Sequence, residues 1–516
     1  MKLFITLIAA CITFFGISQD FKIGQDVKNI GAIKEVQILG PNEYIATSIK
    51  QRIGRNKIVL EHFVNNQKVK EIETPYRVNR SLGKFEDFIL VDGKGFAFIS
   101  DQVGKSRNLY IESLDLEDGD FGKAEFIMED PLPRNRQLPS AFQFKISSNK
   151  KYVGIMVDIS LKGDTISTYQ FVVIDSDKNT INRGRFNLKS PKDGNIDFNF
   201  WVTKTGKIVA YHKECIQENV GLFKNKFILV RSHLYRLDNK EVYHSVLNNT
   251  KDDVAYEVEI EEGKDSSLYV HGFYQHQSHD QISNKIHGAI FKKFSPRLDL
   301  EIETYEEFPT EILLMGLTEE EVRKQRENLS MSDYFLRNSF IDTLHNCIIG
   351  VAEQYYKLEE SYPDSRGYLR TETRYYYNDI LSYRFNLDGR FEWINKAPKI
   401  QVTANDKGYY SSFFSYLNDN QDLVVIYNDD LANYLEDGDY IDPSKQRESF
   451  RRRSGYTTTK LTLDNSTGEK EYEKFITKFQ RKSSLVPRLG YSNADGSVRI
   501  ILIEAQHTYK FVSILD

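Results

Sequence analysis

Short apolar segments separated by polar turns recur along most of this chain. In the clearest copy, an Asp-Gly-Lys turn at residues 92–94 leads into an apolar segment that carries Ala97, and a second segment with an aromatic residue follows at 108–114. Apolar runs of about four to eight residues bounded by turn residues are typical of β-strands. Two further clear copies lie at 144–155 with 170–175 and at 205–211 with 227–230. The pattern predicts pairs of antiparallel strands along the chain.

The repeat extends over the whole chain when the third residue of each leading strand is taken as its marker. The markers are residues 46, 97, 154, 210, 270, 350, 425 and 500. The first four steps, of 51 to 60 residues, are close to the ~40–50-residue period of propeller blades, whereas the last three, of 75 to 80, need insertions. Neighbouring blades cover the faces that one small sheet cannot bury. We therefore expect an all-β fold, a β-propeller of seven or eight four-stranded blades with one short helical insertion, as a single domain over residues 19–516.

Several features of the chain suit a closed ring of blades. Strands at 499–504 and 509–515 reach the C-terminus, and we expect the segment 31–39 to add a strand to this last sheet and seal the ring. Phe, Tyr and Trp make up 13% of the residues, and aromatic side chains favour strands and can fill the gaps between blades. Small residues that suit crowded inner strands stand at several markers, such as Ala46, Ala97, Gly154 and Ala210.

The segment 92–114 resembles the repeat of TolB-like β-propellers, in which a D-G-K turn leads to an I-A-F strand, then S-D, a variable turn and an aromatic strand. Residues 144–155 resemble the same repeat, with Ser148-Asn149-Lys150 in place of the usual turn. The resemblance implies a propeller, often periplasmic or extracellular, that binds partners through its faces. It carries over no catalytic residue, because the repeat is structural and fold does not imply function.

The N-terminus has the pattern of an export signal. Lys2 is followed by an apolar run over residues 3–17, and small residues at Gly16 and Ser18 predict cleavage before Gln19. This run of about 15 residues is short for a membrane span of ~20. A lipoprotein signal ending at Cys11 is the alternative. We expect an extracytoplasmic protein, periplasmic or secreted, with association to the outer membrane as an option and no transmembrane segment after cleavage.

Charge and motifs exclude several function classes. The formal net charge is −5, and no basic cluster of the kind that binds nucleic acid is present. The chain has no P-loop, no G-x-G-x-x-G, no H-E-x-x-H, no C-x-x-C and no G-x-S-x-G. We therefore predict no nucleic-acid partner and no cofactor. Catalytic carboxylates leave no local signature, so the question of an enzyme stays open.

Three insertions account for the long steps, near residues 310–340, 357–373 and 428–455. In the first, Thr318 and Glu321 form a capping box, and Leu317 with Val322 forms a hydrophobic staple. This pattern predicts a helix over 318–328, with a continuation through 334–336 after a break. The second insertion is rich in turn residues.

The third insertion is the most charged part of the chain. Long loops in a compact fold are usually functional or disordered. A self-neutralising loop in water is one interpretation, and a partner-docking loop on one face of the propeller is the other. The docking residues would be Asp429, Asp430, Asp437, Asp439, Arg451, Arg452 and Arg453.

Four of the ten histidines lie between residues 271 and 287. Within this segment, His276, His279 and Asp280 are close enough in sequence to bind a transition metal if the loop folds over. The alternative is a polar hairpin loop, because the spacing lacks a helix that would fix the geometry.

Taken together, these patterns favour an exported propeller that acts as a binding or scaffold module for a protein partner or a cell-envelope component. The alternative is a propeller-fold polysaccharide hydrolase or lyase. Such an enzyme would need carboxylates or basic residues in the central funnel, with aromatic residues as sugar platforms.

Overall fold

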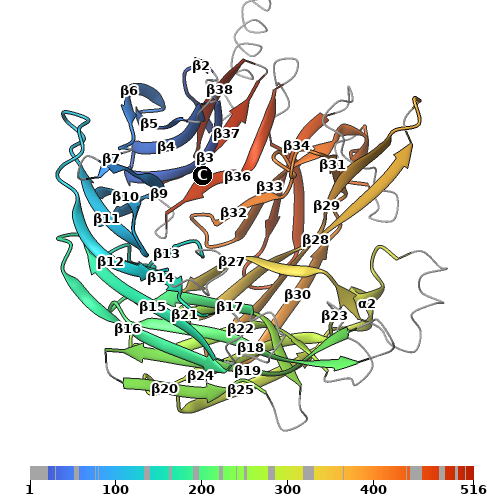
Figure 1. Cartoon of the computed structure of the whole chain (residues 1–516). Helices are drawn as coiled ribbons and strands as arrows, with labels where there is room; N and C mark the ends of the chain where they lie inside the picture. The colour runs from blue at the N-terminus through green and yellow to red at the C-terminus, as the bar shows by residue number, and fades with distance from the viewer. Residues whose placement is uncertain are drawn as a thin grey trace, which may run out of the picture.

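The computed structural model describes residues 21–515 with short internal gaps. The gaps are residues 29–30, 51–56, 76, 79–80, 133–139, 162–165, 190–196, 220–224, 240, 249–252, 277–284, 318–329, 364, 437–438, 442–455, 476–482, 494–497 and 506. In this part of the chain, eight antiparallel sheets of four or five strands follow one another, and they are numbered sheets 1 to 8 below. Figure 1 shows them arranged as a ring, with the colour running once around it from blue to red.

The first four sheets are β3–β6 (Gly31–Gly40, Glu43–Lys50, Lys57–Val64, Gln67–Glu73), β9–β12 (Lys84–Val91, Lys94–Val103, Ser106–Leu114, Glu125–Pro131), β13–β16 (Gln143–Ile146, Tyr152–Asp158, Ile166–Asp175, Thr180–Lys189) and β17–β20 (Asp197–Val202, Ile208–Asn219, Asn225–Asp238, Glu241–Val246). Sheet 5 contains β21, β22, β24 and β25 (Val254–Glu262, Leu268–Gln275, Gly288–Phe294, Leu300–Glu307). Sheet 6 is β27–β31 (Tyr334–Asp342, Cys347–Pro363, Leu369–Asn386, Phe391–Ala397, Gln401–Ala404). Sheet 7 is β32–β35 (Phe413–Leu417, Leu423–Asp430, Tyr456–Leu463, Lys470–Lys474), and sheet 8 is β36–β38 (Ser484–Ser492, Arg499–Glu504, Thr508–Ile514) with β1 (Phe21–Ile23) and β2 (Val27–Lys28).

Two small sheets and two short helices complete the described elements. The small sheets pair β7 (Arg77–Val78) with β8 (Ser81–Leu82) and β23 (Lys285–Ile286) with β26 (Met331–Ser332). The helices are α2 (Thr310–Leu314) and the 3-10 helix η1 (Leu431–Asn433). In the described part of the chain, no helix has the length and apolar character of a membrane span. The all-β propeller predicted from the repeat is confirmed.

The repeat markers fall on equivalent strands. Each of the eight lies in the second strand of its sheet: β4, β10, β14, β18, β22, β28, β33 and β37. The small markers Ala46, Ala97 and Ala210 are completely buried. A Cβ atom on Gly154 would stand 2.5 Å from Cγ2 of Val202 in the next sheet. The small residues therefore mark where adjacent sheets pack most closely.

The ring closes through a segment other than the one expected. Strand β1 pairs with β38, with Phe21 opposite Ile514, and β2 pairs with the same strand. The segment 31–39 instead lies in β3, which begins sheet 1 and pairs with β4. The prediction for 31–39 was wrong because a two-residue connection joins β3 to β4, and such a local hairpin forms at little entropic cost.

Aromatic side chains pack across the closed seam. Tyr44 stacks on Phe63 with ring centroids 5.1 Å apart. Phe511 of β38 meets both rings edge-on, at 4.8 and 5.0 Å. Edge-to-face pairs of this kind add stability beyond the area that they bury. The frequent aromatic residues thus serve as packing between sheets, as expected.

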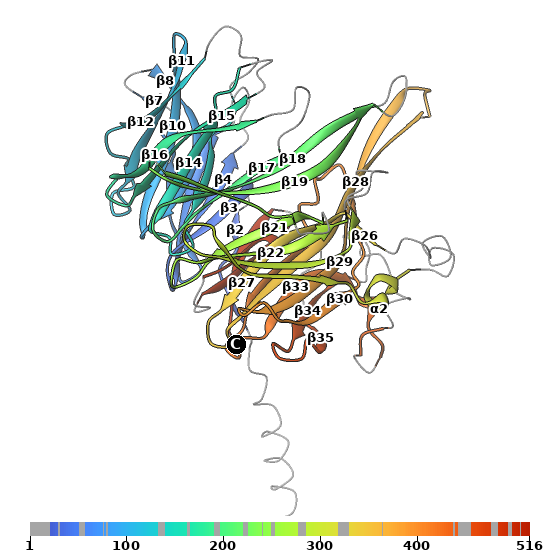
Figure 2. The ribbon, with the colours of Figure 1, turned by 90° about the horizontal axis from the view of Figure 1, so that it is seen from below.

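The insertions differ in form from the sequence expectation. Residues 334–336 belong to β27 and not to a helix, since Tyr334 and Leu336 are buried on alternate positions and pair with β28. The helix predicted over 318–328 lies outside the described residues, and of its hydrophobic staple only Leu317 is described. Residues 357–363 and 369–373 belong to the long hairpin of β28 and β29, which extends beyond the other sheets at the upper right of Figure 2.

Candidate functional site

A polar cavity lies where the first strands of sheets 6, 7 and 8 meet. Its volume is about 1100 Å³, and β27, β32 and β36 supply most of its wall. The turn between β13 and β14 adds Ser148 and Lys150 from sheet 3. Figure 1 places β13, β27, β32 and β36 around the middle of the ring, so the cavity belongs to the central funnel.

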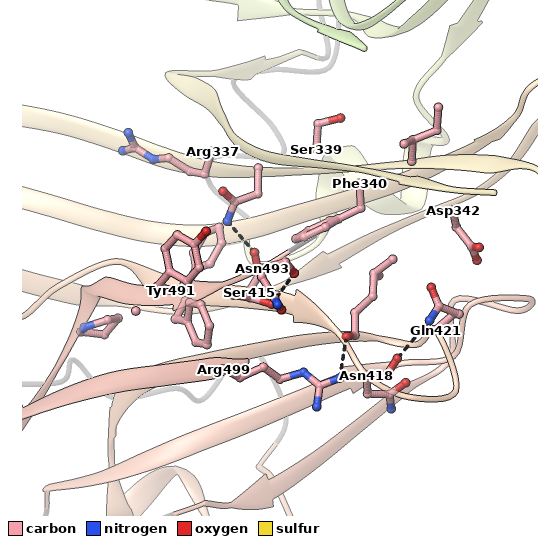
Figure 3. Close-up of a pocket in the computed structure, with 18 of the residues that line it drawn as sticks. Arg337, Ser339, Phe340, Asp342, Ser415, Asn418, Gln421, Tyr491, Asn493 and Arg499 are labelled. Atoms are coloured by element: carbon pink, nitrogen blue, oxygen red, sulfur yellow. Dashed lines mark hydrogen bonds between the residues drawn. The ribbon is translucent and has the colours of Figure 1, made fainter. Parts of the chain in front are cut away.

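The wall combines hydroxyl, amide and aromatic side chains. The side-chain nitrogen of Asn338 donates to Oγ of Ser415 on the neighbouring strand at 2.6 Å. Figure 3 shows Ser415 with Phe340, Tyr491 and other side chains of this wall. Tyr355 and Tyr377 pack together with ring centroids 4.8 Å apart. Tyr491 lies on the same cavity, and the Lys150 ammonium stands 4.8 Å from the centre of its ring.

Four basic side chains line the cavity, and they differ in how far they are neutralised. Arg499 forms an ion pair of 2.8 Å with Asp419. Arg337 donates from Nε to Glu353 at 3.2 Å. Arg488 is exposed and donates to the carbonyl oxygen of Lys407 at 3.4 Å. Among the described residues, no carboxylate forms an ion pair with Arg488 or Lys150.

A buried ion pair supports one wall of the cavity. The Glu353 carboxylate is completely buried and accepts hydrogen bonds from Lys399 Nζ at 2.8 Å and from Ser412 Oγ at 2.8 Å. Lys399 is also buried and donates to Gln401 Oε1 at 3.0 Å. Burial lowers the pKa of Lys399, while the charge of Glu353 opposes that shift. With Arg337 on the same carboxylate, two cations share one negative charge.

Two carboxyl groups of the cavity have pKa values shifted in opposite directions. Burial, together with the charge of Glu259, raises the pKa of Glu261 to about 7. Burial acts in the same sense on Asp342, but hydrogen bonds from His345 and from backbone amides outweigh it and lower the pKa of Asp342. The His345 ring nitrogen lies 2.6 Å from the Asp342 carboxylate. The pKa of Glu261 therefore lies near neutral pH, whereas Asp342 is ionised there.

Two of the predicted docking residues, Asp429 and Asp430, end strand β33 of sheet 7, apart from the cavity lining. Asp429 is buried, and burial raises its pKa. Its carboxylate accepts hydrogen bonds from Tyr440 at 2.6 Å, from Asn433 at 2.7 Å and from Thr459 at 2.9 Å. Asp430 accepts from the Ala432 amide and so caps η1, and Asp439 is exposed. The other predicted docking residues, Asp437, Arg451, Arg452 and Arg453, lie outside the described residues.

The predicted metal ligands are described only in part. The His276 ring is hydrogen-bonded to Asp253 at 2.6 Å and packs against His287 with centroids 4.3 Å apart. His279 and Asp280 lie outside the described residues. Within the part of the chain that is described, no group of three or more His, Cys, Asp or Glu side chains has a metal-binding arrangement.

The cavity residues were not identified from sequence. Arg337, Glu353 and Lys399 are far apart in the chain and belong to no motif. One local signal was present, because Glu353 directly continues the apolar run 347–352. A charge in such a strand must be buried with a partner or point into a polar space. The partner itself follows only from the tertiary structure.

No family model matches the chain, and no curated protein matches it in sequence. Solved propeller structures resemble it in backbone path. The Dos1 propeller is similar with a TM-score of 0.42 and 9% identity over 98% of this chain and 96% of that chain. Polysaccharide lyase Uly1 is similar with a TM-score of 0.34 and 7% identity over 97% and 93%. A prolyl endopeptidase structure matches with a TM-score of 0.36 and 12% identity over 94% of this chain, which spans 55% of that longer chain.

Proposed function

We propose that this protein is an exported binding propeller that holds a segment of an envelope carbohydrate in its central cavity. The observation that carries the proposal is the lining, in which hydroxyls, amides and cations alternate with the rings of Tyr355, Tyr377 and Tyr491. Polar groups of this kind hydrogen-bond sugar hydroxyls, and aromatic rings pack against the apolar faces of sugars. The volume of about 1100 Å³ exceeds the ~300–1,000 Å³ of small-molecule sites and suits a chain segment.

Two features of the sequence support the location and the binding role. The first 18 residues have the pattern of a cleaved signal, which would place the mature chain outside the cytoplasm. The resemblance of the 92–114 repeat to TolB-like propellers is consistent with a protein that binds through one face. Under this proposal the ring is a rigid frame, and the cavity is the site of recognition.

Affinity electrophoresis through gels containing neutral and acidic polysaccharides tests the proposal. We expect at least one polysaccharide to retard the protein. Tyr491→Ala should weaken that interaction roughly two- to tenfold, because it removes one aromatic platform. Tyr110→Ala is the matched control, since Tyr110 lies on β11 and packs against Phe126, apart from the cavity lining. Absence of retardation by every polysaccharide would contradict the proposal.

A polysaccharide hydrolase is the second candidate, and the opposite pKa shifts of Glu261 and Asp342 favour it. Glycoside hydrolysis requires one carboxyl group with a raised pKa as the proton donor and a second one that stays ionised. Release of reducing ends from the retarding polysaccharide would support this candidate. That release should be lost in Glu261→Gln while gel retardation persists.

A further inference from the structure

Two arginines at one end of the cavity have donors to spare. Arg337 uses Nε for Glu353, and its two terminal nitrogens have no hydrogen-bond partner among the described residues. Its side chain is 33% exposed. Arg488 is exposed and makes one long hydrogen bond, from a terminal nitrogen to the carbonyl oxygen of Lys407. Each guanidinium therefore keeps hydrogen-bond donors that an incoming group can use.

Tyr355 and Tyr377, which pack together in the cavity, each contact one part of the surroundings of these arginines. The Tyr377 hydroxyl donates to the carbonyl oxygen of Lys407 at 3.3 Å, and Arg488 donates to that same oxygen at 3.4 Å. The Arg337 guanidinium stands 5.6 Å from the ring centre of Tyr355, which packs on Tyr377. The charges of both arginines act on the Tyr377 hydroxyl and oppose the rise that burial causes in its pKa. Both guanidinium groups therefore lie near Tyr377.

The charge at this end of the cavity is positive. Glu353 is shared by Lys399 and Arg337, so one positive charge remains there. Arg488 adds a second, and Lys150, which contacts Tyr491, adds a third. Of the other cavity carboxyl groups, Asp419 is paired with Arg499, and among the described residues neither Glu261 nor Asp342 forms an ion pair with Arg337, Arg488 or Lys150. An anionic group entering here gains attraction without displacing an existing ion pair.

From this arrangement we propose that the cavity contains a subsite for the carboxylate of an acidic sugar, formed by Arg337 and Arg488 beside Tyr377. The proposal rests on the carbohydrate-binding function above and names its ligand class. The planar guanidinium fork matches a carboxylate in two parallel hydrogen bonds, and charge-assisted bonds of this kind are about twice as strong as neutral ones. Sulfate esters share this chemistry and are separated from carboxylates by the experiment.

Isothermal titration of the mature protein with matched oligosaccharides tests the subsite. The probes are oligomers of galacturonate, mannuronate and glucuronate, each with its carboxyl-reduced neutral form, and a sulfated dextran oligomer. We expect at least one acidic oligomer to bind about tenfold more tightly than its reduced form. Arg488→Met should remove most of this preference. Arg488→Lys should retain only part of it, because an ammonium lacks the planar pair of donors of a guanidinium. Arg390→Met, in the exposed turn between β29 and β30, is the control and should leave the preference unchanged.

The outcomes separate the subsite from the proposed function. Equal binding of acidic and reduced oligomers, or a preference that Arg488→Met and Arg337→Met both leave intact, would overturn the subsite alone. Tighter binding of the sulfated oligomer than of every carboxylated one would overturn the carboxylate assignment. Binding of none of the probes would contradict the proposed function and the subsite with it. Circular dichroism of each variant identifies any that fails to fold. If Arg488→Met or Arg337→Met does not fold, the partial loss of preference in Arg488→Lys tests the subsite, since that variant keeps the charge at an exposed position.

Discussion

The buried pair of Glu353 and Lys399 gives the sharpest prediction about stability. Lys399→Met removes the ammonium that lies 2.8 Å from the Glu353 carboxylate and leaves a completely buried charge. Loss of one partner of a buried ion pair typically costs about 3–5 kcal/mol. Glu353 keeps a hydrogen bond from Ser412 and the more distant Arg337, so we expect about 3 kcal/mol for this variant.

A double-mutant cycle shows whether the cost comes from the broken pair. Glu353→Leu combined with Lys399→Met removes both charges, and an apolar replacement of a buried pair is often close to neutral. We expect the double variant to lose at least about 2 kcal/mol less than the sum of the single variants. Urea unfolding at pH 7 measures this, followed by tryptophan fluorescence, to which Trp393 in β30 of the same sheet contributes. A Lys399→Met cost below about 1 kcal/mol, or strictly additive costs, would refute the reasoning.

Three further predictions concern stability elsewhere in the ring. Burial raises the pKa of Glu112 from its ordinary value of 4.5 to about 7, so the folded state binds more protons than the unfolded state between these values. Stability should therefore fall as pH rises through this window, and Glu112→Gln should flatten the fall and add about 2 kcal/mol at pH 8, as measured by urea unfolding. Gly154→Val should lower the melting temperature by several degrees because a side chain there collides with Val202; an unchanged melting temperature would contradict the packing argument. Asp429→Ala removes the carboxylate that accepts hydrogen bonds from Tyr440 and Thr459, and limited proteolysis should then cut the 428–455 insertion faster than in Asp439→Ala, the exposed control.

The repeat could be predicted from sequence because its causes are local. Apolar alternation and turn residues at Asp92-Gly93-Lys94 specify hairpins whatever the rest of the chain does. Close packing between sheets selects small residues such as Ala97 and Gly154, so the markers identified all eight second strands. The form of the insertions was harder to predict from sequence. The stretch 357–373 contains turn residues, and yet most of it lies in the two long strands of the β28–β29 hairpin.

The cavity could not be predicted, because its parts are distant in the chain. Arg337, Tyr377 and Arg488 come from different strands and meet only when sheets 6 and 8 are placed in the ring. The burial of Asp429 is a second example. In sequence it begins an acidic run that suggests a solvated loop, whereas in the structure three side chains donate hydrogen bonds to its carboxylate.

The sequence by itself determined the strands, their grouping into repeating units and the small residues at their tightest contacts, since these follow from periodicity and side-chain volume over short distances. The tertiary structure decided which end segment closes the ring, which charges are buried in pairs and which remain free. Those outcomes depend on long-range contacts, where several segments of similar composition compete for the same position. Phe21–Ile23 occupies the edge of the last sheet because β3 is already paired in its own hairpin, and Arg488 keeps free donors because no carboxylate of the described chain comes within ion-pair distance of it.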